Sequence, residues 1–248
     1  MLNGHKIIVV LPAYNAERTL RKTVSEIPTD MIDEILLVDD QSSDRTVEIA
    51  KELGLHIFQH PKNLGYGGNQ KTCYEEALKH QADVIVMLHP DYQYDPKLLV
   101  AMVAPICYGV YDVMLGSRII GGKAIEGGMP RLKYYVNRGL TFFQNLIFRR
   151  KLSEYHTGYR AFHRMVLTSV PFHKNSNNFV FDNQILAQIF YHAFRVGELS
   201  CPTRYFKEAS SIGLMRGIQY AWGCIVTAFQ YLMQKNRMTS FKIFEDSI

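Results

Sequence analysis

The chain has 248 residues, 47% of them hydrophobic and 21% charged, a balance that excludes a predominantly disordered protein. Its formal net charge of +5 suits a phosphorylated ligand or an anionic membrane surface, and without a nucleic-acid-binding motif it does not indicate a nucleic-acid partner. The four cysteines stand far apart, so we expect reduced thiols in a cytoplasmic protein. We expect neither a signal peptide nor a membrane-spanning segment.

The first half of the chain alternates predicted strands and helices. Short apolar runs predict five strands, at residues 6–11, 32–38, 56–58, 84–88 and 112–116. Helices are expected between them, at residues 16–27, 46–53, 68–80 and 96–108, with Asn15 and Asp95 as N-caps and Gly54 after the second helix. This order predicts an α/β fold with a mostly parallel, doubly wound sheet that binds ligands at the carboxyl ends of its strands.

The second half is less regular. We expect a glycine-rich loop at residues 121–128, helices at 131–148 and 183–192, and a turn-rich segment at 154–160. No repeat or linker interrupts the chain, so we predict a single domain over residues 1–210 with a helical extension over residues 211–248.

The predicted extension contains a helix over Leu214–Gln234 with a narrow polar strip and a wide apolar face. Such a face fits a buried core helix, a homo-oligomer interface or a peripheral contact with a membrane. We rank burial or oligomerisation narrowly ahead of membrane contact. The polar strip consists of Arg216, Gln219, Gly223, Thr227, Gln230 and Gln234.

A cluster of metal-ligand types follows the predicted strand at 84–88. His89, Asp91 and Gln93 alternate, so an extended chain would turn all three to one side. An imidazole, a carboxylate and an amide oxygen suit Mn²⁺ or Mg²⁺ better than a thiolate-type zinc site. The alternative is structural: His89 and Pro90 would form a turn and Asp91 would begin another.

Acidic residues also follow the second predicted strand. Asp39 and Asp40 are adjacent at the strand end, where carboxylates can accept hydrogen bonds from a nucleobase and a ribose. For Asp44 we favour a helix-capping role. Pro12 and Tyr14 follow the first strand and by themselves indicate only a strand-to-helix turn.

Taken together, six segments resemble glycosyltransferase family 2, the inverting enzymes of the GT-A fold, and within it the dolichyl-phosphate mannose synthase and polyprenyl-phosphate branch. The resemblance covers residues 6–210. Its segments are Pro12-Ala13-Tyr14-Asn15-Ala16-Glu17, residues 38–46, Asn63-Leu64-Gly65-Tyr66-Gly67, residues 89–93, Gly116-Ser117-Arg118 and Thr157-Gly158-Tyr159-Arg160.

The resemblance implies roles for the donor side of the site. A nucleotide-diphosphate sugar, UDP- or GDP-linked, would be held by six residues, and Mn²⁺ or Mg²⁺ would bind Asp91 with His89 and Gln93 as further ligands. The family usually has an aspartate where this chain has His89, so we expect an altered metal preference rather than lost activity. The donor-binding residues would be Pro12, Tyr14, Glu17, Asp39, Asp40 and Arg160.

It also implies an acceptor side. Arg118 and Arg131 would face the phosphate of a lipid-phosphate acceptor; a surface ion pair is an equal alternative for Arg131 and Lys133. A phosphate acceptor needs no strong base, whereas a hydroxyl acceptor would need one, for which Asp182 is the candidate. Asp91, Arg118 and Asp182 are therefore the predicted catalytic residues.

The leading prediction is a metal-dependent inverting glycosyltransferase acting on a polyprenyl phosphate, cytoplasmic, with peripheral contact at the cytoplasmic face of the membrane as a further expectation. One alternative is transfer to a hydroxyl in cell-surface polysaccharide or glycoconjugate synthesis. Two others are a nucleotidyltransferase, which the missing glycine-rich signature loop disfavours, and a non-catalytic nucleotide-sugar binding protein.

Overall fold

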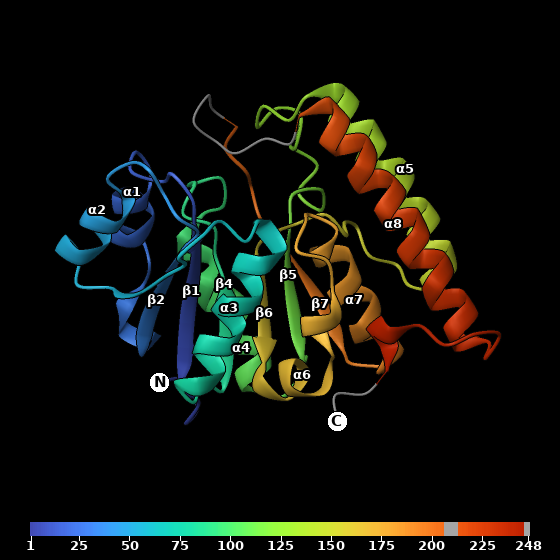
Figure 1. Ribbon diagram of the computed structural model, residues 1–248, viewed down its shortest axis with the longest axis horizontal. Coiled ribbons are helices and arrows are strands. Elements are labelled where there is room, and N and C mark those ends of the chain that lie inside the picture. Colours follow the sequence, from blue (N-terminus) through green and yellow to red (C-terminus); the bar gives the residue numbers. More distant parts are fainter. Residues whose placement is uncertain (206–212, 246–248) are drawn as a thin grey trace.

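The computed structural model describes residues 1–205 and 213–245, so the predicted domain boundary at residue 210 lies outside the described residues. A seven-stranded sheet forms its centre, in the order β3-β2-β1-β4-β6-β5-β7 (Figure 1). The strands are β1 (Ile7–Ala13), β2 (Glu34–Asp39), β3 (His56–Gln59), β4 (Val84–Met87), β5 (Val113–Ser117), β6 (Arg160–His163) and β7 (Val196–Ser200).

Within the described residues, eight α-helices surround the sheet, and α5 has the same bounds as the helix expected at residues 131–148. The prediction of a mostly parallel, doubly wound sheet is confirmed, with β6 as the antiparallel exception between β4 and β5. The helices are α1 (Leu20–Ser25), α2 (Thr46–Glu52), α3 (Tyr66–Lys79), α4 (Leu99–Cys107), α5 (Arg131–Phe148), α6 (Arg164–Ser169), α7 (Phe181–Tyr191) and α8 (Leu214–Lys235).

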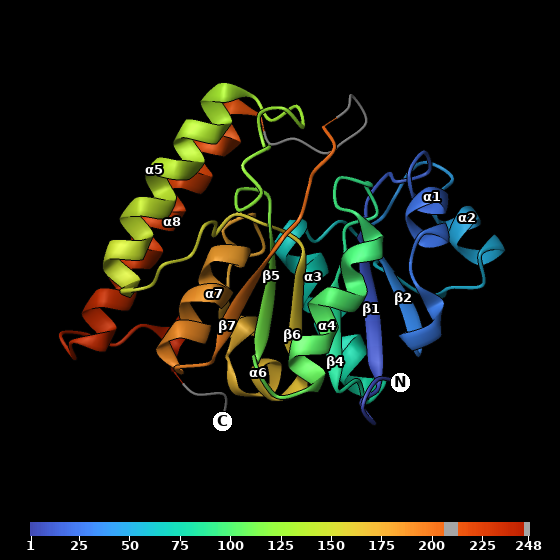
Figure 2. The ribbon, with the colours of Figure 1, turned by 180° about the vertical axis from the view of Figure 1, so that it is seen from behind.

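Apolar residues that alternate along the strands fill two cores, one on each face of the sheet. Ile8 and Val10 of β1 point into the core under α3 and α7, whereas Ile7 and Val9 point into the core under α1, α2 and α4. This period of two is the side-chain geometry of a strand buried on both faces. The two faces are seen from opposite sides in Figures 1 and 2.

The expected start of the first helix is wrong. Asn15 adopts a left-handed conformation with φ of 53°, and α1 begins only at Leu20, after Thr19. The Oδ1 atom of Asn15 accepts a hydrogen bond from the amide of Ser43 at 2.9 Å. Asparagine tolerates this conformation better than most residues, so its side chain joins two loops instead of capping a helix.

Helices α5 and α8 lie side by side at the β7 end of the molecule (Figures 1 and 2). The amphipathic projection of the C-terminal helix does not match its packing: Thr227 of the expected polar strip is buried, and Gly223 lies against Val180. Small residues such as Gly223 and Thr227 let α8 approach its neighbours closely on this side. The larger Trp222 therefore points away from the contact and is 66% exposed. No described helix is long and apolar enough to cross a bilayer.

Candidate active site

The predicted donor-binding residues gather at the carboxyl edge of β1 and β2. The register of these parallel strands pairs Pro12 with Val38 and Ala13 with Asp39, and the amide of Asp40 donates to the carbonyl of Ala13. Tyr14, directly after β1, is exposed at the same edge. Four of the six predicted donor residues are thus neighbours at one end of the sheet.

Asp40 organises the loop that leads into α3. Its carboxylate accepts hydrogen bonds from the amides of Leu64 and Gly65, at 2.8 and 3.0 Å, and lies 2.8 Å from Nδ1 of the buried His60. Gly65 has a φ of 83°, a conformation that favours glycine. The structure therefore gives Asp40 a positioning role, and direct contact with a nucleotide stays a prediction.

Asp39 offers a different arrangement. One carboxylate oxygen accepts from the amide of Ser42 at 3.1 Å, while Oδ1 is buried without a hydrogen-bond partner in the described structure. An unpartnered buried carboxylate oxygen is costly unless a ligand completes it. This oxygen is suited to an N–H or O–H donor of a bound molecule.

Glu17 and Asp44 meet between the loops after β1 and β2. Oε2 of Glu17 accepts from the amide of Arg45 at 3.0 Å, and Asp44 accepts from the amides of Thr46 and Glu17. Asp44 therefore caps the first turn of α2, as predicted. Glu17 binds the same helix start, and its predicted contact with the nucleotide stays untested.

The segment that carries the predicted metal ligands turns instead of extending. Tyr92 has a φ of 58°, and the amide of Gln93 donates to Oδ1 of Asp91 at 3.0 Å, an Asx-type turn. The expectation that an extended chain aligns all three side chains is wrong for this reason. Asp91 is half-buried, whereas Gln93 is buried, and their role as ligands stays a prediction.

His89 faces Tyr66 at the start of α3. The two rings stack with centroids 5.4 Å apart, and the hydroxyl of Tyr66 donates to Asp182 at 2.6 Å. That hydroxyl lies 3.3 Å from Nε2 of His89 and, having used its proton, can only accept from Nε2–H. Nδ1 of His89 then carries the lone pair, as a metal ligand requires.

Burial supports the neutral form of His89. Loss of solvent lowers the pKa of its imidazole, although the charges of Asp91 and Asp182 act in the opposite direction. Gly158 closes the other side: a Cβ atom at this position would lie 2.8 Å from the ring. The glycine of Thr157-Gly158-Tyr159-Arg160 is thus required by the close approach of His89.

Arg160 lies in β6, beside the end of β4, where the sequence suggested only turns. Its guanidinium has no exposed surface and donates to the backbone carbonyls of Thr157, Asp182 and Tyr155. Oδ1 of Asp182 lies 3.8 Å from it. This geometry favours a role in holding α7 and the segment before β6, and the predicted contact with donor phosphates stays untested.

Arg118 forms a buried ion pair with Glu154. Its Nε lies 2.8 Å from Oε1 of Glu154, its Nη2 also reaches that carboxylate, and Asn137 of α5 donates to the same oxygen at 2.8 Å. Burial alone would raise the pKa of Glu154, but the charge of Arg118 keeps it below its usual value. The pair fixes α5 against the end of β5.

The two predicted basic residues of the first turn of α5 differ. Arg131 is exposed, while Lys133 is half-buried, with its ammonium 5.3 Å from the centre of the Tyr205 ring. Burial and the charge of Arg118 lower the pKa of Lys133, and the charge of Asp91 acts against them. Lys133 therefore lies close enough to Asp91 of the predicted metal-binding turn for the two charges to interact.

Tyr66 and Glu154 received no role from the sequence. Tyr66 stood inside a quoted motif, Asn63-Leu64-Gly65-Tyr66-Gly67, but nothing local indicated that it would reach Asp182, 116 residues away. Glu154 lay in a turn-rich segment and pairs with a residue 36 positions earlier. Only a three-dimensional arrangement reveals either contact.

Comparison with known proteins identifies the family. The Glycosyl transferase family 2 model matches residues 8–170, more than half of the chain. The chain belongs to this family. This glycosyltransferase has the predicted GT-A fold: it superposes with a TM-score of 0.72 on glucosyl-3-phosphoglycerate synthase from Mycobacterium tuberculosis, solved with Mn²⁺, UDP and glucosyl-3-phosphoglycerate, at 20% identity and covering 96% of this chain and 82% of that one.

Two relatives match most of the chain and are of similar length. An uncharacterized protein of Methanocaldococcus jannaschii is 28% identical over 234 residues, 94% of each chain. The UDP-N-acetylglucosamine–dolichyl-phosphate N-acetylglucosaminyltransferase of Methanococcus voltae is 26% identical over 224 residues, 84% of this glycosyltransferase and 89% of the relative.

Proposed function

We propose that this glycosyltransferase moves a sugar, with inversion, from a nucleotide-diphosphate sugar to a polyprenyl phosphate at a membrane surface. The observation that carries the proposal is an exposed, apolar and basic surface on α5 and α8. The first turns of both helices lie toward the loops that hold the candidate site (Figures 1 and 2). The dolichyl-phosphate acceptor in the name of the Methanococcus voltae relative supports it.

Large apolar side chains project from both helices. Phe142 and Leu146 of α5 are 73% and 69% exposed, and a contiguous exposed apolar surface indicates a partner or a membrane. Residues 131–151 contain six Lys or Arg and no Asp or Glu. Such a surface fits an anionic bilayer. Its other exposed apolar residues are Leu132, Tyr135, Val136, Met215, Ile218, Trp222, Val226 and Phe229.

The donor would bind at the edge formed by β1 and β2. The unpartnered Oδ1 of Asp39 supports a hydrogen bond to the nucleotide, and Asp40 would hold the neighbouring loop in shape. The presence of UDP in the structure of the mycobacterial synthase supports a nucleotide as a ligand of this fold.

A divalent ion, Mn²⁺ or Mg²⁺, fits the residues at the turn after β4. The carboxylate of Asp91, the neutral imidazole of His89 and the amide of Gln93 are ligand types that such ions accept, and the Nε2–H tautomer inferred for His89 leaves Nδ1 to coordinate. When bound, the ion would neutralise charge on the departing nucleotide diphosphate.

The surroundings of Asp182 favour a phosphate acceptor over a hydroxyl. Asp182 already accepts a hydrogen bond from Tyr66 at 2.6 Å and lies next to Arg160, so groups of the protein already engage its carboxylate. A phosphate oxygen is already anionic and attacks the anomeric carbon without a base. The bond from that carbon to the diphosphate then breaks on the opposite face. Lys133 and Arg131 are the basic groups proposed to receive the acceptor phosphate.

The test is transfer from radiolabelled UDP- and GDP-sugars, with Mn²⁺ or Mg²⁺, to anionic vesicles that contain a polyprenyl phosphate. We expect label to enter the organic phase and Asp91→Ala to reduce transfer by at least 100-fold, on the order of 3 kcal/mol in the barrier. Donor hydrolysis without lipid labelling would contradict the acceptor assignment and redirect the search to hydroxyl acceptors.

A second variant tests whether the exposed apolar surface on α5 binds the membrane. Phe142→Asp with Leu146→Asp should weaken vesicle binding and transfer to vesicle-borne lipid, yet preserve transfer to a short, water-soluble polyprenyl phosphate. Tyr108→Asp is the matched control, because Tyr108 is 65% exposed but lies at the end of α4. Equal loss with both acceptors would contradict membrane docking through α5.

A further inference from the structure

Three side chains that the proposed reaction does not use converge near the amino ends of β2 and β3. Oε1 of Glu34 lies 3.0 Å from Nδ1 of His56 and 2.7 Å from Nδ1 of His80, and the three atoms lie within 4.8 Å of one another. Within residues 1–205 and 213–245, no other group of three or more His, Cys, Asp or Glu residues brings its ligand atoms this close. We call these residues the edge cluster.

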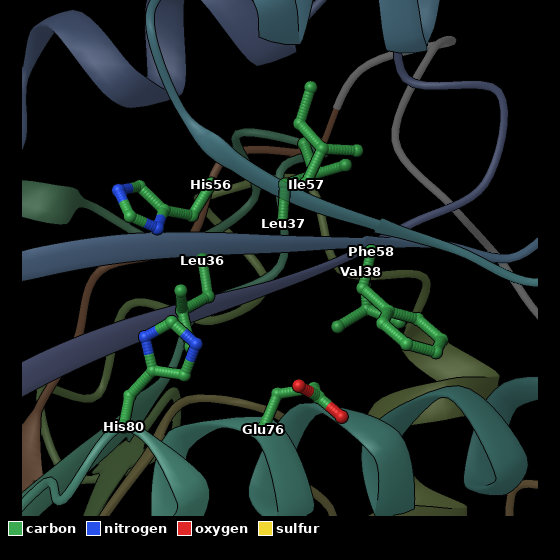
Figure 3. Close-up of a pocket in the computed structure, with 8 residues that line it drawn as sticks. All are labelled: Leu36, Leu37, Val38, His56, Ile57, Phe58, Glu76 and His80. Atoms are coloured by element: carbon green, nitrogen blue, oxygen red, sulfur yellow. The ribbon is translucent and has the colours of Figure 1, made fainter.

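The edge cluster joins three separate segments. Glu34 begins β2, His56 begins β3, and His80 follows the last residue of α3. Figure 3 shows both imidazoles at one end of a pocket between these elements, with Phe58 at the other. The pocket encloses about 170 Å³ and opens to solvent. An ion or small ligand can therefore reach the cluster from outside.

The cluster lies far from the candidate active site. Glu34 and Asp39 occupy opposite ends of β2, and five residue steps along a strand span roughly 16 Å. The carboxyl edge of the sheet holds the nucleotide-binding residues, while Glu34 stands at the amino edge. A ligand of this cluster is thus distinct from the donor and its metal.

Two imidazoles and one carboxylate are the ligands of many zinc sites that keep a fourth position for water. Zinc bonds of about 2.0–2.1 Å place tetrahedral ligand atoms roughly 3.3 Å apart. The observed separations of 2.7 and 3.0 Å are hydrogen-bond distances, so the carboxylate would retreat by a few tenths of an ångström. His56, whose side chain is 64% exposed, has room to follow.

Lys6 fixes the orientation of the carboxylate. Its ammonium lies 3.5 Å from Oε2 of Glu34 and donates to the carbonyl of His80 at 2.7 Å. It thereby holds the second carboxylate oxygen and leaves Oε1 directed at the two imidazoles. Its positive charge also opposes a cation, so we expect weaker binding than in a zinc site without a neighbouring lysine.

We propose that Glu34, His56 and His80 bind a divalent transition metal ion, with Zn²⁺ the best match to the ligand set. The ion would fasten the edge strand β3 to β2 and to the end of α3. Strand β3 has only four residues, most of them exposed, and is paired on one side alone. A metal that binds only the folded chain stabilises it in proportion to its affinity and concentration.

The test is a calorimetric titration of the metal-free, full-length protein with Zn²⁺, in excess Mg²⁺ and UDP to occupy the donor site. We expect one Zn²⁺ per chain, a rise in Tm on binding, and a loss of affinity of at least tenfold in His56→Ala and in His80→Ala. With Co²⁺ in place of Zn²⁺, a visible absorption band should appear in the wild type and be lost in both variants.

The chain provides a matched control. Nδ1 of His173 lies 3.0 Å from Oε1 of Glu75, and its side chain is 56% exposed, but no second histidine joins this pair in the described structure. His173→Ala should bind Zn²⁺ as the wild type does. His56→Ala should retain the transferase activity of the wild type. Unchanged Zn²⁺ affinity in both cluster variants, or no Zn²⁺ binding by the wild type, would overturn the proposal.

Discussion

The two sides of the candidate site hold their charges in opposite ways. On the donor side, the carboxylates of Asp39 and Asp40 accept mainly from backbone amides, and one oxygen of Asp39 has no partner in the described structure. On the acceptor side, Arg118 is buried and surrounded by a glutamate and a carbonyl oxygen.

The donor-side carboxylates can therefore bind a ligand, whereas the buried guanidinium on the acceptor side stabilises the fold. A guanidinium whose donors are taken by the protein shapes the site without contacting the substrate directly. The half-buried Lys133 and the exposed Arg131 are therefore better placed to receive an acceptor phosphate than Arg118 is. The unfolding free energy should therefore depend more strongly on the buried ion pair of the acceptor side, Arg118–Glu154, than on an exposed ion pair.

The largest expected effect follows from removing one partner of that pair. Glu154→Gln would leave Arg118 buried without its counter-charge, and loss of one member of a buried ion pair costs about 3–5 kcal/mol of unfolding free energy. Urea denaturation measures this change. Glu52→Gln, in the exposed pair with Arg21, is the control and should change stability far less. Similar losses in the two variants would remove the distinction between the two sides.

A pH series tests the same region through His156. Burial lowers the pKa of His156 to about 4, with the charge of Glu154 opposing this and those of Arg118 and Arg160 reinforcing it. In the unfolded chain the imidazole binds a proton near pH 6.5, whereas in the folded chain it does so only near pH 4. The contribution of His156 to the unfolding free energy is therefore fully retained above pH 6.5 and is lost as the pH falls toward 4. The linked change is about 3 kcal/mol.

His156→Gln isolates that contribution. The variant should lose less unfolding free energy than the wild type between pH 7 and pH 4, because it lacks the buried imidazole that the unfolded state protonates. Urea denaturation at several pH values in that interval gives the difference directly, and other titrating groups cancel between the two proteins. Parallel pH profiles for wild type and variant would contradict burial of a neutral imidazole beside Arg118.

The sequence predicted the edge formed by β1 and β2 better than the antiparallel strand β6 for a physical reason. Apolar runs followed by Asp39 and Asp40 report a strand and its carboxyl end, and parallel strands bring such ends together. The positions of β6 and Arg160 were missed because the four residues of that strand, Arg160–His163, carry too short a pattern. Its place between β4 and β5 depends on pairing with residues far along the chain.

The C-terminal helix shows a second limit. Its residue pattern separates a narrow polar strip from a wide apolar face, yet α8 buries Thr227 of the strip and exposes Trp222 of the apolar face. A helical projection assumes that the widest apolar face is buried. Close packing against α7 through Gly223 outweighed the preference to bury the widest apolar face. The membrane proposed above would cover the apolar side chains of α8 that remain exposed.

The smallest expected effect concerns the donor side. Asp40→Asn replaces one acceptor oxygen with an amide nitrogen, so either Oδ1, which serves Leu64 and His60, or Oδ2, which serves Gly65, no longer accepts. Loss of hydrogen bonds to a charged group costs about 1.5–3 kcal/mol. Urea denaturation should show this loss, and transfer assays should show a raised KM for the nucleotide-sugar because the loop before α3 is no longer held. Glu48→Gln, on the exposed surface of α2, should change neither. A lower kcat with an unchanged KM would instead indicate that Asp40 stabilises the transition state, so that the donor side would contribute to catalysis as well as to binding.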